Sequence, residues 1–157
     1  MLPLLLVLLL SFGACGRRPD LGADRAALLR LHDLAQTAHL EERPDLLVAS
    51  FADSLLNVSR GAVTVRTPVE SRARFKAYFD RSTFLEWADL AAPVIRISPD
   101  GQMAYVIVQK RVRLNALDSA GVERAVHTIF AWVELYEKQG GRWTLRAVAS
   151  TDRPGTT

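Results

Sequence analysis

The spacing of apolar residues changes about halfway along the chain. In residues 24–41 they recur every three or four positions, which predicts an amphipathic helix with Asp24 as its N-cap. The positions that would form its buried stripe are Ala27, Leu28, Leu31, Leu34, Ala35 and Ala38.

Shorter elements follow this helix. Pro44 can begin a second, short helix that reaches about Ser54, and two short strands are expected at 55–59 and 62–66. Thr67-Pro68-Val69-Glu70 is a capping box with proline at the first helical position. It predicts a third helix that ends near Asp80 and turns Phe75, Tyr78 and Phe79 inward.

Beyond residue 83 the pattern becomes that of long strands, rich in β-branched and aromatic residues. Turn sequences separate them, and Ala92-Pro93 marks a bend or bulge in the first strand. Helices followed by an antiparallel meander indicate an α+β fold. The expected strands are 84–98, 102–117, 122–138 and 142–151.

Residues 24–152 resemble the nuclear-transport-factor-2-like superfamily, in particular its SnoaL-like branch of unknown function. The resemblance lies in the first helix and in the segments ERPDLLVASFADSLLNVSRG, RFKAYF, PVIRISPDGQMAYVIVQKRV, FAWVELYEK and GRWTLRAVAST. It implies a cone-shaped, curved antiparallel sheet around N-terminal helices (a cystatin-like α+β barrel), with a pocket and often a dimer through the outer sheet face. Members include isomerases, dehydratases and cyclases. None of their catalytic motifs is matched, so no catalytic residue is carried over.

The N-terminus predicts export. Residues 1–14 hold eleven hydrophobic residues and no charge, too short a run to span a membrane but typical of a signal peptide. The stretch that ends in Cys15 resembles a lipoprotein signal, although Phe12 replaces the usual leucine and no basic residue precedes the apolar run. It implies a lipid on Cys15, a tether over 15–23 and a bacterial envelope location, on the outer membrane facing the periplasm. The alternatives are an ordinary cleaved signal with an incidental cysteine, or a buried thiol.

Composition and charge exclude several kinds of site and partner. The chain has 157 residues, of which 49% are hydrophobic, and a single cysteine, which excludes an internal disulfide and a zinc site of several thiolates. The formal net charge is +3 without a long basic run, so we expect no nucleic-acid partner. Residues 110–113 are interpreted as a solvated or edge-protecting stretch of strand. Residues 153–157 are a C-terminal tail, and neither a metal nor a cofactor is expected.

Three side chains are candidates for acid–base chemistry. His32 and His39 lie seven positions apart on the first helix and therefore share a face. Glu134 alternates with Trp132 and Tyr136, and if that face lines the cone its pKa should be raised. The alternatives are two histidines at the edge of the core and a solvated or paired carboxylate. His127 could join from the sheet, but its placement is open.

The residues predicted to line a ligand pocket are mostly aromatic. Arg72 shares the inward face of its helix with Phe75 and Phe79, and its guanidinium could meet an anionic ligand there. The alternative is that its stem lies along the core with its head in solvent. The full set is Arg72, Phe75, Phe79, Trp132 and Tyr136.

Three functions are consistent with these patterns. The first is a lipid-anchored, non-catalytic module that binds a small apolar ligand or a partner protein. The second is an acid–base enzyme of isomerase, dehydratase or cyclase type that acts on a hydrophobic small molecule. The third is a structural homodimer in an envelope complex. Membrane contact is expected through the lipid anchor only.

Overall fold

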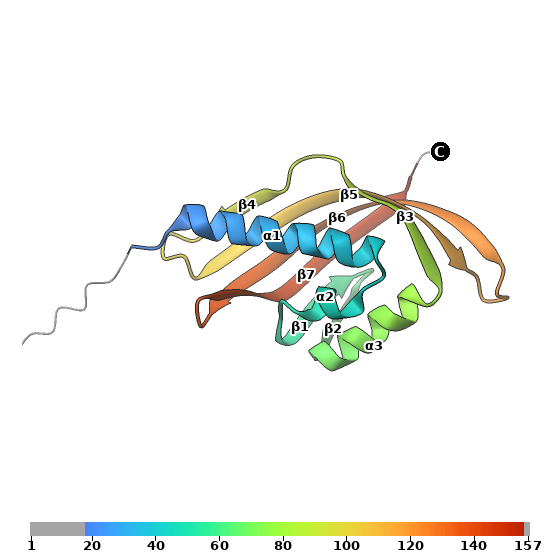
Figure 1. The fold of residues 1–157 in the computed structure, drawn as a ribbon, viewed down its shortest axis with the longest axis horizontal. Coiled ribbons are helices and arrows are strands. Elements are labelled where there is room, and N and C mark those ends of the chain that lie inside the picture. The colour runs from blue at the N-terminus through green and yellow to red at the C-terminus, as the bar shows by residue number, and fades with distance from the viewer. Residues whose placement is uncertain (1–17, 156–157) are drawn as a thin grey trace, which may run out of the picture.

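The computed structural model describes residues 18–155 (Figure 1). Residues 18–155 form three helices and seven strands: the helices lie in the first half together with short strands, and long strands fill the second half. Their bounds are α1 (Leu21–Leu40), α2 (Pro44–Val48), β1 (Phe51–Ser59), β2 (Ala62–Arg66), α3 (Pro68–Phe79), β3 (Ser82–Asp89), β4 (Val94–Ile97), β5 (Met103–Leu117), β6 (Glu123–Gln139) and β7 (Arg142–Pro154).

The strands form one curved sheet, and α1 lies across one of its faces (Figure 1). The strand order is β2-β1-β7-β6-β5-β3, and β4 also pairs with β5. The expected antiparallel meander is present in β5, β6 and β7. The sheet is nevertheless mixed, because β1 pairs with β7 in parallel. The α+β class and the curved sheet around N-terminal helices are confirmed.

Several predicted boundaries differ from the observed ones. Helix α1 begins at Leu21 rather than at Asp24, because the side chain of Asp20 accepts the hydrogen bond from the Ala23 amide. Helix α2 is shorter than predicted, and β1 begins at Phe51. The single strand predicted over 84–98 is two strands, since the chain leaves the ladder between Asp89 and Val94 around Pro93, which has no N–H to donate.

Asp24 has a tertiary role instead of a capping role. Its carboxylate is buried, contacts the Lys138 ammonium and accepts a hydrogen bond from the Trp143 indole at 3.1 Å. It therefore links the first turn of α1 to the β6–β7 hairpin.

No helix of residues 18–155 combines the length and apolarity needed to cross a membrane.

Two apolar clusters form the core beneath α1. The first surrounds Leu28 and includes Val106 and Val108 of β5. The second joins Ala38 of α1 to Phe79 of α3 and Val112 of β5. Strand β5 alternates strictly between exposed and buried positions, so its even-numbered residues from Ala104 to Leu114 face the core. Position 110 belongs to this buried series and holds a lysine.

Candidate functional site

A polar cluster lies inside the core, under α1 and on the inner face of the sheet. Four elements contribute to it: α1 supplies His32, β3 ends in Asp89, the middle of β5 carries Lys110, and β6 carries Glu134. His32, Lys110 and Glu134 are all buried. We call these four residues, with Gln36, Trp132 and Tyr136 around them, the interior cluster.

Lys110 is the most deeply buried member, with only 1% of its surface exposed. The sheet register places it opposite Asp89, and its Nζ lies 2.7 Å from Asp89 Oδ1. It also donates to Gln36 Oε1 at 3.0 Å, and His32 Nε2 is 3.5 Å away. A charge removed from water needs such partners, because an unpaired buried ammonium would destabilise the folded state by several kcal/mol.

His32 and Asp89 form a dyad. His32 Nε2 lies 2.8 Å from Asp89 Oδ2, and the Asp89 side chain keeps 27% of its surface exposed, so the cluster meets solvent there. Burial acts to raise the pKa of Asp89, but hydrogen bonds from Lys110 and His32 and the charges of those residues outweigh it and hold this pKa below its usual value. The dyad therefore contains an ionised carboxylate that orients the imidazole. Within residues 18–155, His32 Nδ1 has no hydrogen-bond partner.

Glu134 is buried on the same face of the sheet, near enough for the charges of His32 and Lys110 to act on it. The Trp132 indole N–H donates to its Oε1 at 2.8 Å, and the Tyr136 hydroxyl lies 3.1 Å from its Oε2. Burial raises the pKa of Glu134, while these two hydrogen bonds and the charges of His32 and Lys110 partly oppose the rise. Burial and the neighbouring Glu134 raise the pKa of Tyr136 well above its usual value, so this phenol stays neutral.

The cluster combines two kinds of ionisable side chain. Glu134 is a carboxyl group whose pKa is raised by burial, and His32 is an imidazole held by Asp89, a carboxylate whose pKa is lowered. The geometry thus supplies an acid and a base from one set of side chains.

No group of three or more His, Cys, Asp and Glu side chains in residues 18–155 is arranged to hold a metal ion.

His39 shares the buried face of α1 with His32 but faces different neighbours. Its ring stacks on Trp87 with centroids 3.7 Å apart, and the rings of Phe75, Phe79 and Phe84 meet it edge-on. Its Nδ1 donates to the Ala35 carbonyl at 2.7 Å. Burial lowers the pKa of His39 to about 4, with the charge of Lys110 acting in the same direction and the Ala35 hydrogen bond against it. His39 is therefore a neutral part of an aromatic cluster at neutral pH.

The residues predicted to line one pocket are divided among three places. Trp132 and Tyr136 belong to the interior cluster, whereas Phe75 and Phe79 pack in the second apolar cluster with His39. Arg72 does not point inward as placed: its side chain is 53% exposed and pairs with Asp45 of α2. The reason is that Ser71 and Phe79 take the buried positions of α3, which leaves Arg72 at the surface.

The sequence-based reasoning missed Lys110, Asp89 and Gln36. A signal for Lys110 was present, because it continues the alternation of Val106, Val108 and Val112. No comparable signal marked Asp89. A register shift between Phe84 and Glu86 changes which residues of β3 face the core, and simple alternation does not reveal it.

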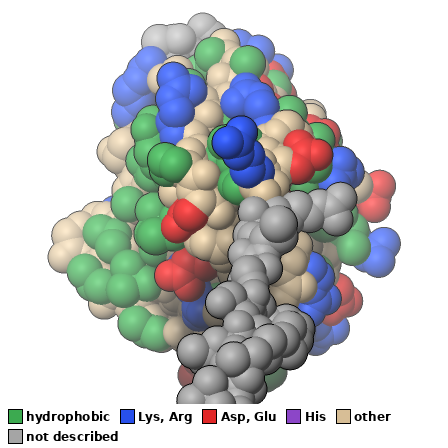
Figure 2. All heavy atoms as spheres, turned by 90° about the vertical axis from the view of Figure 1, so that its left-hand side faces the viewer, with side chains coloured by type: hydrophobic (Ala, Val, Ile, Leu, Met, Phe, Trp, Pro, Cys, Tyr) green, Lys and Arg blue, Asp and Glu red, His purple; other side chains and the backbone are tan. Residues whose placement is uncertain are grey.

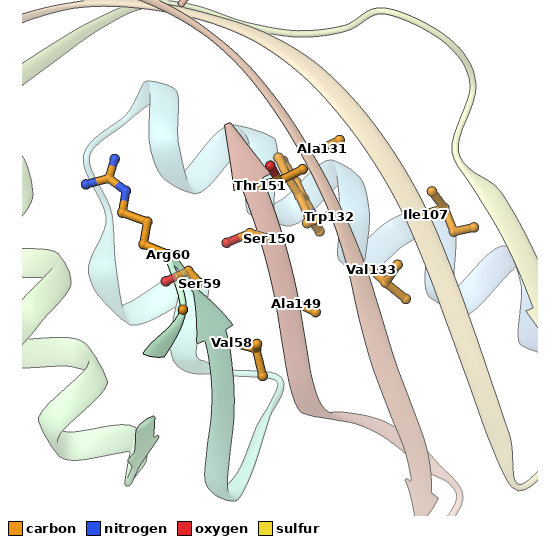
Figure 3. Close-up of a pocket in the computed structure, with 11 residues that line it drawn as sticks. Val58, Ser59, Arg60, Ile107, Ala131, Trp132, Val133, Ala149, Ser150 and Thr151 are labelled. Atoms are coloured by element: carbon orange, nitrogen blue, oxygen red, sulfur yellow. The ribbon is translucent and has the colours of Figure 1, made fainter. Parts of the chain in front are cut away.

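A second feature lies on the opposite face of the sheet (Figure 3). It is a shallow pocket of about 420 Å³ with Arg60 near one end. Its lining is largely apolar and includes Val58 of β1, Ile107 of β5, Val133 of β6 and Ala149 of β7. The apolar side chains exposed on this outer sheet face include Tyr105, Ile107, Val133 and Leu135.

No protein-family model matches the sequence, and no curated protein is significantly similar to it. Solved structures do match the fold. A candidate dehydratase of the nuclear-transport-factor-2-like family from Streptomyces avermitilis has a TM-score of 0.67 at 12% identity, covering 88% of this chain and 100% of that one. A ketosteroid isomerase-like protein from Erwinia carotovora atroseptica has a TM-score of 0.63 at 15% identity, covering 83% and 96%.

A third solved structure is a nuclear-transport-factor-2-like protein of unknown function in nutrient uptake from Rhodospirillum rubrum. Its TM-score is 0.61 at 17% identity, and the match covers 79% of this chain and 96% of that one. At these identities the similarity is one of architecture. The chain therefore has the nuclear-transport-factor-2-like fold, a curved sheet wrapped around N-terminal helices.

Proposed function

We propose that the interior cluster is an acid–base active site for a small carbonyl compound with a largely apolar body. The observation that carries this proposal is the convergence of His32, Asp89, Lys110 and Glu134, from four elements, in a buried position. Such a cluster adds little to stability, because desolvation cancels much of the attraction between buried charges. A buried gathering of titratable groups, in which the pKa of Asp89 is lowered and that of Glu134 is raised, is typical of functional sites.

The proposed chemistry needs one acid and one base. Glu134 in its protonated form, which burial favours by raising its pKa, gives its proton to the carbonyl oxygen while His32 Nδ1 takes a proton from the adjacent carbon. The C–H electron pair becomes the C=C bond of an enol. The imidazolium then returns its proton to a carbon of the enol, and the enol hydroxyl returns its proton to Glu134. Asp89 orients the imidazole and stabilises its charged form.

Exchange of carbon-bound protons tests this proposal directly. 2-Tetralone in D₂O should lose its α-proton NMR signals faster with the protein than in buffer alone. Glu134→Gln and His32→Gln should each reduce the protein-dependent rate about 100-fold, the usual size of a general acid or base contribution. Glu137→Gln is the matched control, since Glu137 pairs with Arg146 outside the cluster and its change should leave the rate unaltered.

The same experiment separates the enzyme from a non-catalytic binding module. Tetralone signals that broaden in the presence of protein, without exchange above the buffer rate, would leave binding as the function of this domain. The shallow apolar pocket in Figure 3 is the observation that favours binding without chemistry. Exchange that survives both substitutions would place the reacting groups elsewhere.

We further propose that the domain is anchored to the bacterial envelope by a lipid on Cys15, with the outer membrane facing the periplasm as its location. Cys15 lies outside the described residues, so the proposal rests on the sequence. Labelled palmitate should be incorporated into the protein in a bacterial host, and Cys15→Ser should abolish both labelling and membrane retention. Labelling that persists in the variant would contradict the lipoprotein assignment.

The outer sheet face supports a homodimer as a further proposal. Tyr105, Ile107, Val133 and Leu135 leave between 36% and 42% of their surfaces exposed on adjoining strands. A second copy of this face would cover them. The protein should sediment as a dimer at micromolar concentration, and Ile107→Asp should convert it to a monomer because a carboxylate would be buried without a partner. A monomeric parent protein would contradict the proposal.

A further inference from the structure

A groove on the other side of α1 does not share a residue with the interior cluster. Its volume is about 540 Å³, within the range of roughly 300–1,000 Å³ that is usual for small-molecule sites. Ala27, Leu31 and Leu34 form an apolar stripe along its helical side. Across from them are residues of the α2–β1 connection and of the β6–β7 hairpin: Ala49, Ser50, Gly141 and Trp143.

Two arginines give the groove its charge. Arg30 of α1 and Arg142 of β7 line it, and neither forms an ion pair within residues 18–155. The third charged lining residue is Asp24, which pairs with Lys138 just outside the lining. The positive charges of Arg30 and Arg142 are therefore not neutralised by the acidic residue of the groove.

The groove lies toward one end of the molecule. Figure 1 shows that α1 begins at the same end as the β6–β7 turn. Figure 2 looks onto that end, where Lys and Arg side chains stand among apolar and acidic ones. A ligand that fits must therefore satisfy guanidinium groups and cover an apolar surface at the same time.

We propose that this groove binds a fatty-acid-like anion. The carboxylate would meet the guanidinium groups of Arg30 and Arg142, which match carboxylates with paired hydrogen bonds. The alkyl chain would lie on the stripe of Ala27, Leu31 and Leu34 and displace water from it. The positive charge of the two arginines requires an anionic head group, and the apolar stripe requires an alkyl tail. A small inorganic anion would leave the stripe uncovered, and a neutral alkane would leave the guanidinium groups without a partner.

Calorimetric titration with decanoate, below its micelle concentration, tests the assignment. Decanoate should bind the purified protein, and the double variant Arg30→Gln/Arg142→Gln should bind it at least tenfold more weakly. Decanol and acetate should each bind at least tenfold more weakly than decanoate to the unaltered protein. Arg74→Gln is the matched control: Arg74 is an exposed arginine of α3, away from the groove, and its change should leave the affinity unaltered.

NMR of the tryptophan indoles locates the ligand. The Trp143 indole signal should shift on addition of decanoate, whereas that of Trp132 in the interior cluster should not. Equal affinity for decanol and decanoate, or a loss of binding in Arg74→Gln as large as in the double variant, would overturn the proposal. So would a shift at Trp132 with none at Trp143, because the ligand would then occupy the interior site.

Discussion

Replacement of Lys110 by methionine should lower the free energy of unfolding by about 3 kcal/mol, within the range seen when one partner of a buried ion pair is removed. Methionine fills nearly the same volume, so the loss comes from charge rather than from a cavity. Asp89 would keep its negative charge without the ammonium 2.7 Å away, and Gln36 would lose its donor. Urea denaturation at pH 7 measures the change.

A matched surface pair gives the comparison. Lys76 pairs with Asp80 one turn along α3, with both side chains more than half exposed. Lys76→Met should cost no more than about 0.5 kcal/mol, as exposed pairs at this spacing usually do. A loss below about 1 kcal/mol for Lys110→Met would show that the buried pair is less strongly coupled than its geometry indicates.

A second substitution keeps this prediction testable if Lys110→Met folds poorly. Asp89→Asn in the Lys110→Met background removes the charge that was left unpaired, so it should restore part of the lost stability. In the parent protein the same Asp89→Asn change should destabilise. This reversal of sign is the expected result of coupling between the two groups. Two effects that simply add would contradict direct coupling.

His39→Phe should remove most of the acid sensitivity of the protein between pH 6.5 and 4. His39 has a folded-state pKa of about 4, lowered by burial from 6.5, so below pH 6.5 the unfolded chain binds a proton that the folded chain does not. The parent protein should therefore lose about 3 kcal/mol of stability at this residue across that window. Phenylalanine keeps an aromatic ring against Trp87 but cannot be protonated.

The measurement is the free energy of unfolding at several pH values for parent and variant. The difference between the two proteins isolates His39, because the other groups titrate in both. Glu134 acts in the opposite direction: its raised pKa stabilises the folded state as the pH falls toward 4.5. His127→Gln is the control and should retain the acid sensitivity. A His39→Phe protein as acid-sensitive as its parent would show that His39 is protonated in the folded state.

The sequence was sufficient for features that depend on local patterns. The capping box at Thr67 predicted the start of α3, and β-branched and aromatic residues between turn sequences predicted the long strands of the second half. Pairings distant in sequence were not predicted, such as the parallel match of β1 with β7. Local propensity carries no information about which edges meet, so the mixed character of the sheet had to come from the structure.

The candidate site was likewise predictable in its local patterns but not in its pairings distant in sequence. His32, Glu134, Trp132 and Tyr136 were found as chemical types on plausible faces, and the structure brings them together. Lys110 was assigned to a solvated basic stretch because its neighbours in sequence are arginines, although it follows the buried alternation. Asp89 depends on a register shift in β3 and on its partner across the sheet. Polar groups that stabilise one another inside a core are visible only once the strands are aligned.

The position of β7 has a consequence for how the chain folds. The last strand along the sequence lies between β1 and β6, so it joins the first hairpin to the meander. Until residues 142–154 are available, β1 and β6 each present an unpaired edge. A chain that emerges from its N-terminus first therefore cannot close its sheet until nearly every residue is present. Late closure leaves the edges of β1 and β6 open while the rest of the chain is already present, so protection from aggregation is needed until the end of the process.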